Sequence, residues 1–449
     1  DEINEAALRE KINKAWKEVY YQLGRNQNAP LSDDEFLRAH WIMYFAYSRK
    51  KGDDYIKFLL RKFSHKNIFL DSAEVAAPEE DDTVPVVTDD EDEVDDPSEN
   101  SEPEINVNTP GFLAPREIAD YVNSLNETAE YWYYSFYPDE CSSISKEEQV
   151  WIGRLNRIGI GYFRPLVTVS LVPSVGATSD ERIAFYKAVE RFIFIDFRLA
   201  MYQSSYQSSE FYRNTRKVYR KEMKLHEVTA LLNKITDGDI PGALQVFGTK
   251  MDKRFISGDG FYSWRDLKYF LYEYEYSLVS KYKIEKLQWA DLTKVVRDQV
   301  SVEHILPQTP TKYYWRNQFR QFIGNDDEMK CLAASLGNLL PLSKSINSKL
   351  QNDSFEEKKE ADWDAQRIYK RGIKLLHFME ERWNFKFASQ EQMDDLLHIS
   401  FVNDGRDVPA EISEEDDTDV SDQTSDDLRL QYWTKALPVL ADAFGGNST

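Results

Sequence analysis

Four polar side chains in the last third of the chain have types that suit metal-assisted hydrolysis: Glu303, His304, Asn338 and Asn347. The first two lie within an apolar run, SVEHILPQ, and the other two come a few dozen residues later. An imidazole can accept a proton near neutral pH. Carboxylate and amide oxygens are hard ligands that suit Mg²⁺ or Mn²⁺ better than Zn²⁺. Together, these residues can hold one metal ion beside one general base.

These residues are expected on a small ββα unit. Residues 301–306 and 336–340 are short β-prone runs, Pro307 ends the first, and a polar segment that is compatible with a helix follows the second. Because neighbouring side chains of a regular strand face opposite sides, Glu303 and His304 can serve one site only if the strand twists or bulges there.

Each of these signals is weak when it is taken alone. A Glu-His pair on a strand is usually a satisfied polar pair, and Gly-Asn between apolar residues is usually a turn. The joint spacing is what favours a site. In that site, Asn338 is expected to hydrogen-bond across the hairpin and to hold the loop after His304 in place.

Length and composition predict a largely folded protein of two or three domains, with 449 residues of which 14% are aromatic. The two cysteines, Cys141 and Cys331, exclude a disulfide framework and fit a reducing, cytoplasmic compartment. No apolar run is long enough to span a bilayer, and the start, DEIN, is not a signal peptide. The absence of an initiating Met suggests a fragment of a longer chain.

The net charge of −22 does not exclude a nucleic-acid partner, because it is concentrated in two segments. Residues 71–104 contain 16 acidic and no basic side chains, and residues 404–427 contain 11 acidic side chains and one arginine. The rest of the chain carries 51 acidic and 55 basic side chains. The body of the protein is therefore slightly basic.

Periodicity and composition predict a mainly α fold with a small α+β element, in six segments. These are a helical segment that docks on the body (1–70), an acidic disordered linker (71–110), a helical domain (111–290), the domain of the ββα unit (291–400), an acidic disordered tail (401–427) and a short C-terminal helix (428–449). The linker could mimic nucleic-acid charge and occupy a basic groove, but a solvated spacer is the favoured interpretation.

A basic, tyrosine-containing stretch at 211–224 could follow a phosphate backbone as a helix. Its candidate nucleic-acid-binding residues are Arg213, Arg216, Lys217, Arg220 and Lys221. A charge run on a helix is more often a solvated face, and that alternative stays open.

The motif VEHILPQ, the later LGNLLPLS and Asn347 nine residues after Asn338 resemble the HNH, or His-Me finger, nuclease signature. With the trailing pattern L-x-N-x-x-F-x-x-K, the chain resembles the C-terminal nuclease domain of the GmrSD type IV restriction family, which SspE-like phage-defence proteins share. The resemblance covers roughly residues 290–390. More loosely, it extends upstream to residues 1–65 and to WRDLKYFLYEYE.

The resemblance implies a role for each matching position. It makes His304 the general base, Glu303 and Asn347 the ligands of Mg²⁺ or Mn²⁺, Asn338 the orienting residue, Lys358 a phosphate contact and Arg371 a structural residue. The implied activity is metal-dependent nicking or cleavage of foreign, possibly modified, DNA as the effector part of a phage-defence system. The alternative is a non-catalytic nucleic-acid-binding or scaffold subunit.

Two features depart from the family pattern. The gap between His304 and Asn338 is longer than in a compact HNH hairpin, so residues 309–335 are expected to form a helical insertion. Family members usually begin with a nucleotide-dependent domain that carries a DGQQR-type motif, and this sequence contains no such motif. An NTPase or sensor domain is therefore expected to be a separate partner or to precede this chain.

Overall fold

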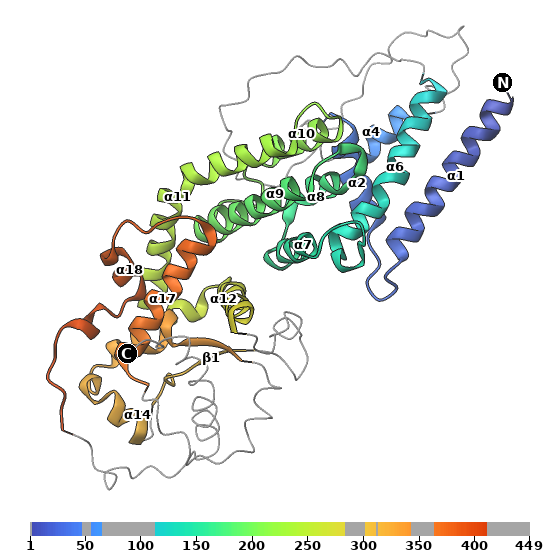
Figure 1. Cartoon of the computed structure of the whole chain (residues 1–449). Helices are drawn as coiled ribbons and strands as arrows, with labels where there is room; N and C mark the ends of the chain where they lie inside the picture. The colour runs from blue at the N-terminus through green and yellow to red at the C-terminus, as the bar shows by residue number, and fades with distance from the viewer. Residues whose placement is uncertain are drawn as a thin grey trace, which may run out of the picture. The chain divides into compact units, whose positions relative to one another are not determined.

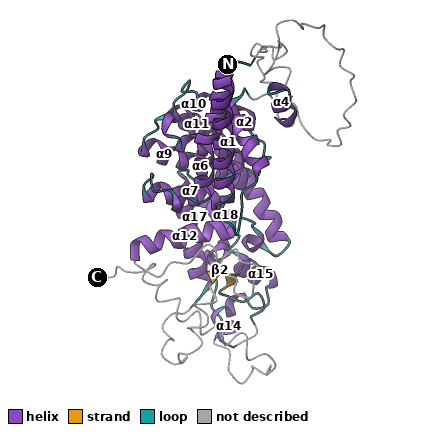
Figure 2. Ribbon diagram, turned by 90° about the vertical axis from the view of Figure 1, so that its right-hand side faces the viewer, coloured by secondary structure: helices purple, strands orange, loops and turns teal. Residues whose placement is uncertain are grey.

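The computed structural model describes residues 2–46, 55–64, 113–282, 301–310, 313–342 and 363–410. These ranges are mainly helical and their strands form a single two-stranded sheet, which confirms the expected mainly α fold with a small β element (Figures 1 and 2). The acidic linker and the C-terminal helix that we expected lie outside the described residues, as does the acidic tail from residue 411. Among the helices described, none is both long and apolar enough to cross a membrane.

The chain folds into two compact units, and each unit is assembled from separated segments. The first unit comprises Asp1–Lys146, Tyr162–Arg182 and Gln207–Leu225, and the second comprises Glu147–Gly161, Ile183–Tyr206 and His226–Thr449. The domain boundaries expected from composition stay a prediction.

The first unit is a bundle of helices in which α1 and α6 lie side by side (Figure 1). Their buried faces carry Val19 and Leu23 on α1 and Leu125 and Ala129 on α6. These positions recur at helical spacing, so each helix turns one apolar face towards the other. The described elements of this unit are α1 (Glu2–Gly24), α2 (Asp33–Tyr44), α4 (Tyr55–Lys62), α6 (Pro115–Phe136), η1 (Pro138–Glu140), η2 (Gly161–Phe163), α8 (Arg164–Leu171), η3 (Pro173–Val175) and α10 (Ser208–Tyr219).

The first unit contains a fully buried histidine. His40 on α2 is fully buried, and its Nε2 lies 2.9 Å from the hydroxyl oxygen of Ser124 on α6. Burial disfavours the charged imidazolium and lowers the pKa of His40 to about 3. The ring is therefore neutral at physiological pH.

The second unit contains the sheet and α11, the longest of the described helices. Its described elements are α7 (Lys146–Ile158), α9 (Ser179–Phe192), the π-helical turn η4 (Ile193–Leu199), α11 (Leu225–Ile256), η5 (Gly260–Ser263), α12 (Leu267–Tyr282), β1 (Ser301–His304), α14 (Tyr313–Gln318), η6 (Arg320–Phe322), α15 (Asp326–Ala334), η7 (Leu336–Asn338), β2 (Leu339–Leu342), α17 (Ala365–Trp383), α18 (Gln390–Leu397) and η9 (Ser400–Asn403). The helices α14 and α15, with η6 between them, confirm that the segment between the two strands is a helical insertion.

Side-chain caps fix where several helices begin. The backbone N–H of Glu35 donates to Ser32 Oγ at the start of α2. A reciprocal capping box opens α9, where the backbone N–H of Glu181 donates to Thr178 Oγ1 and the Glu181 carboxylate accepts from the Thr178 backbone N–H. Asp364 caps α17 by accepting from the backbone N–H of Arg367 at 2.7 Å.

Two buried glutamates anchor the interior of the second unit. Glu273 forms ion pairs with Arg154 at 3.0 Å, Arg157 at 3.1 Å and Arg382 at 3.3 Å. Glu190 pairs with the same Arg382 at 2.9 Å. Because an unpaired buried carboxylate is costly, these arginines are held in fixed positions by the glutamates behind them.

Candidate active site

The two strands place the Glu-His pair at one end of an antiparallel hairpin. In this sheet Glu303 lies opposite Leu340, and His304, the last residue of β1, lies opposite Leu339. Both polar side chains are partly exposed. Ile305, which follows directly, is fully buried, so the chain turns into the core immediately after His304.

Asn338 ties the turn after His304 to the insertion. Its Oδ1 accepts from the backbone N–H of Leu306 at 2.7 Å, and its Nδ2 donates to the carbonyl oxygens of Leu306 and Ala333, both at 2.9 Å. The indole N–H of Trp363 donates to the same Oδ1 at 3.3 Å. Asn338 is fully buried, so its amide is used entirely within the protein. This is the hydrogen bond across the hairpin that the Gly-Asn spacing suggests.

Gly337 lets the hairpin approach α17 closely. A Cβ atom at this position would lie 1.9 Å from the carbonyl oxygen of Ile368 and 2.8 Å from the backbone nitrogen of Gly372. Both obstacles are backbone atoms of α17, which cannot move aside as a flexible side chain can. The glycine of the Gly-Asn pair is therefore required by packing.

A buried arginine on α17 supports the strand that begins at this turn. Arg371 is almost fully buried, and its Nη1 donates to the carbonyl oxygens of Gly337 at 2.7 Å and Leu339 at 2.8 Å. Burial lowers the pKa of the Arg371 guanidinium, and burial raises the pKa of the nearby Glu275 carboxyl, an effect that Arg371 opposes. These contacts fit the structural role that the sequence suggests for Arg371.

An aromatic ring lies against His304, and the sequence pattern does not identify it. The Tyr262 ring on η5 lies with its centroid 4.4 Å from that of His304, at an interplanar angle of 39°, and its side chain remains 45% exposed. Gly260 fixes η5 at this place, because its φ is +46° and an added Cβ would lie 2.8 Å from the Ala334 carbonyl. The GFYSW segment gives no signal of its own that would identify Tyr262.

The remaining predicted site residues are distributed as follows. Asn347 and Lys358 lie outside the described residues. The basic residues of 211–224 belong to the first unit, on α10 and just beyond it. Arg213, Arg220 and Lys221 are exposed there, and Arg220 also donates to the carbonyl oxygen of Tyr44 at 3.2 Å. Within the described ranges, no three His, Cys, Asp or Glu side chains lie close enough to hold a metal ion together.

A cavity of about 620 Å³ begins beside the loop that follows Pro307. Gln308 lines it together with Asp259, Lys330, Cys331 and His398. His398 stacks on Phe255, with ring centroids 4.2 Å apart, and its Nε2 lies 2.9 Å from Asp252 Oδ1. The cavity brings together polar groups from the loop between α11 and η5, from α15 and from the loop after β1.

The helix-supported hairpin and its neighbours correspond to a known domain. Residues 250–396, about a third of the chain, match the family model described as GmrSD restriction endonucleases, C-terminal domain. This segment of the chain therefore belongs to the C-terminal domain family of the GmrSD restriction endonucleases. The match begins before η5 and so includes Tyr262 as well as the hairpin and α17. No curated protein and no solved structure matched the chain.

Proposed function

We propose that the chain is an HNH-type, divalent-metal-dependent endonuclease that nicks or cleaves foreign, possibly modified, DNA as the effector of a phage-defence system. The match to a restriction endonuclease domain supports the endonuclease class. The observation that carries the HNH assignment is the Asn338 clamp, which holds the turn directly after a partly exposed Glu303-His304 pair.

In the proposed reaction His304 accepts the proton of the attacking water, because a neutral imidazole is the natural base near pH 7. Asn338 acts indirectly, by fixing the backbone at Leu306 and so the position of the imidazole. Lys358 is proposed to contact the phosphate. Positioned bases of this kind contribute roughly 10²–10⁴-fold to rate.

The residues available for a metal fit a hard divalent cation. Glu303 supplies a carboxylate that remains partly exposed, and Asn347 is proposed to supply an amide oxygen. An all-oxygen set completed by water suits Mg²⁺ or Mn²⁺. When bound, such an ion would neutralise charge on the phosphate and on the leaving oxygen.

The basic residues on α10 and just beyond it are proposed to contact DNA. Arg213, Lys217 and Lys221 are the best candidates for phosphate contacts, because Arg216 and Arg220 already have partners in the first unit. Contacts of this kind carry little sequence information and depend strongly on salt. An NTPase or sensor domain, separate or in the same longer protein, is the proposed source of regulation.

The competing function is a scaffold subunit that binds nucleic acid without cutting it. Both functions predict DNA binding, but only the nuclease predicts turnover that depends on His304. The buried supports of the hairpin, Asn338 and Arg371, would suit either function, because they maintain shape.

Plasmid nicking separates the two functions. The purified chain is incubated with supercoiled plasmid or phage DNA, with and without Mg²⁺ and nucleoside triphosphates, and with an added sensor partner where one is known. The variants are His304→Ala and, as a matched control, His226→Ala, which removes an exposed histidine elsewhere in the second unit. Metal-dependent nicking that only His304→Ala abolishes supports the nuclease. Equal cutting by both variants would place the chemistry elsewhere.

A further inference from the structure

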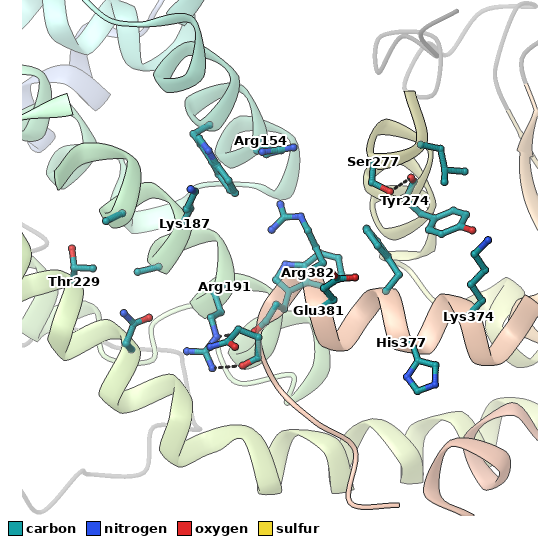
Figure 3. A pocket seen from close by; sticks show the side chains of 18 residues that line it. Arg154, Lys187, Arg191, Thr229, Tyr274, Ser277, Lys374, His377, Glu381 and Arg382 are labelled. Atoms are coloured by element: carbon teal, nitrogen blue, oxygen red, sulfur yellow. Dashed lines mark hydrogen bonds between the residues drawn. The ribbon is translucent and has the colours of Figure 1, made fainter. Parts of the chain in front are cut away.

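One cavity of the second unit has no role in the proposed nuclease reaction. It has a volume of about 870 Å³ and is lined by residues of α7, α9, α11, α12 and α17 and by Asn384 at the end of α17 (Figure 3). Pockets for small ligands and cofactors typically have volumes of about 300–1,000 Å³. The cavity is therefore large enough for a nucleotide-sized molecule.

The charged residues in the wall of this cavity are mainly cationic. Its charged lining residues are Arg154, Lys187, Arg191, Lys374 and Arg382, against the single acid Glu381. Three of the cations surround the Trp151 indole: Arg154 lies 4.3 Å from the ring centroid, Arg382 5.1 Å and Lys187 5.4 Å. Figure 3 shows Arg154, Lys187, Arg191 and Arg382 gathered in one part of the cavity. This concentration of positive charge favours an anionic ligand.

The acids that balance these cations lie behind them and do not line the cavity. Glu190 and Glu273 are buried and fix Arg154 and Arg382, as described above. Such pairing holds the guanidinium groups in place before a ligand arrives, so less conformational entropy is lost on binding. The arrangement differs from a solvated charge run, in which the cations stay mobile.

Arg191 is the most enclosed of these cations, with its side chain only 9% exposed. Its Nε donates to the Trp383 carbonyl at 2.8 Å, and its Nη2 donates to Asp237 and to the Asn384 carbonyl. These bonds leave the two donors of Nη1 for a ligand. A guanidinium fixed in a partly enclosed site is well suited to a phosphate group.

The wall of the cavity also contains aromatic and amide groups. The Phe378 ring is partly exposed and is held in place by Tyr274 and Trp383, at centroid distances of 5.1 and 6.1 Å. Asn233 on α11 adds an amide that can both donate and accept hydrogen bonds. A flat ring such as a nucleobase can stack on an aromatic side chain like Phe378.

We propose that this cavity binds a nucleoside phosphate, with the phosphate against the arginines and the base towards Phe378. The proposal goes beyond the nuclease function and does not rest on it, because it concerns a different set of residues. The cavity need not enclose the ligand fully, because the cations supply most of the attraction for its phosphate groups.

Calorimetric titration of the full chain tests this site directly. The probes are ATP and GTP, with inorganic tripolyphosphate and adenosine as the two halves of the ligand, and a short single-stranded oligodeoxynucleotide as the competing polyanion. Lys187→Glu reverses one charge of the wall, and Ala184→Trp fills the cavity from an exposed lining position without changing charge. Lys268→Glu is the control, because Lys268 is exposed on α12 and does not line the cavity.

We expect a nucleoside triphosphate to bind more tightly than either half. Both cavity variants should weaken that binding about tenfold or more, the usual effect of losing a charge-assisted contact, while Lys268→Glu leaves it unchanged. Unaltered thermal unfolding of the variants shows that they fold. The proposal is overturned if neither nucleotide binds at millimolar concentration, or if tripolyphosphate binds as tightly as ATP. It is also overturned if the oligonucleotide binds and the nucleotides do not. The same holds if both cavity variants bind the nucleotides as tightly as the wild type does.

Discussion

Asn338 and Leu306 form two reciprocal hydrogen bonds: the Leu306 N–H donates to Asn338 Oδ1 at 2.7 Å, and Asn338 Nδ2 donates to the Leu306 carbonyl at 2.9 Å. A side-chain amide thus takes the place of a strand neighbour for the second residue beyond β1. Because His304 ends that strand, its backbone is fixed on one side by the sheet and on the other by this amide.

Asn338→Ala should disorder the turn after His304. The change removes three buried hydrogen bonds that the asparagine makes to the backbone, and buried groups left without partners cost about 1–3 kcal/mol each. We expect the free energy of unfolding to fall by about 2–4 kcal/mol and nicking to fall at least tenfold. Urea unfolding and plasmid nicking measure both. Asn123→Ala, at an exposed position of α6, should change neither, and normal nicking by Asn338→Ala would refute the clamp.

Gly337→Ala should be more harmful than its small size suggests. The new Cβ would meet backbone atoms of α17, so the hairpin and the helix must separate. We expect a loss of stability of about 2–4 kcal/mol, as for other overpacked or strained sites. Gly242→Ala on α11 meets nothing within 4 Å and should stabilise the helix by about 0.5–1 kcal/mol. Equal unfolding midpoints for the two variants would show that the close approach is unimportant.

Tyr262 is predicted to position His304 through its ring and not through its hydroxyl. Tyr262→Phe keeps the ring and should retain most activity, whereas Tyr262→Ala removes the surface against which the imidazole rests. For the alanine variant we expect a fall in nicking rate of about tenfold and a changed pH profile, because the surroundings of the base change. Equal losses in both variants would assign the effect to the hydroxyl.

His40 should make the first unit sensitive to acid. Its pKa is about 3 in the folded state and about 6.5 when unfolded, so the unfolded chain binds more protons between these values. Stability contributed by neutral His40 is therefore complete above pH 6.5 and is lost as the pH falls. Lowering the pH from 7 to 5 should cost about 2 kcal/mol through this residue. His40→Gln should flatten this part of the unfolding profile, and an unchanged slope would show that another group is responsible.

The two proposed roles at the metal site predict different responses to Mn²⁺. Asn347→Ala removes a ligand, so it should raise the metal concentration that cutting requires, and excess Mn²⁺ should partly restore activity. His304→Ala removes the base, costs about 10²–10⁴-fold in rate and should not be rescued. DNA affinity, followed by gel shift, should change little in His304→Ala. Equal rescue of the two variants in a metal titration would contradict the assigned roles.

Local signals in the sequence predicted the helices and the hairpin well, because they depend on residues close together in the chain. The helical spacing at Val19 and Leu23, the capping box at Thr178 and the Gly-Asn pair are of this kind. Arg371 on α17 and Tyr262 on η5 reach the hairpin from distant segments, so no local pattern indicates what they touch. The cationic cavity has the same origin: its arginines come from α7, α9 and α17, and only packing brings them together.

The support that Arg371 gives to the hairpin has a consequence for how the chain can be divided. Arg371 on α17 donates to the carbonyl oxygens of Gly337 and Leu339, and α17 follows both residues in the sequence. The hairpin is therefore synthesised before the helix that supports it. A protein that stops before residue 365 would contain all the proposed site residues, yet it would lack the helix that holds the carbonyl groups of Gly337 and Leu339. Loss of cutting by such a truncated chain would therefore say nothing about those residues, and a minimal nuclease fragment has to extend beyond Trp383.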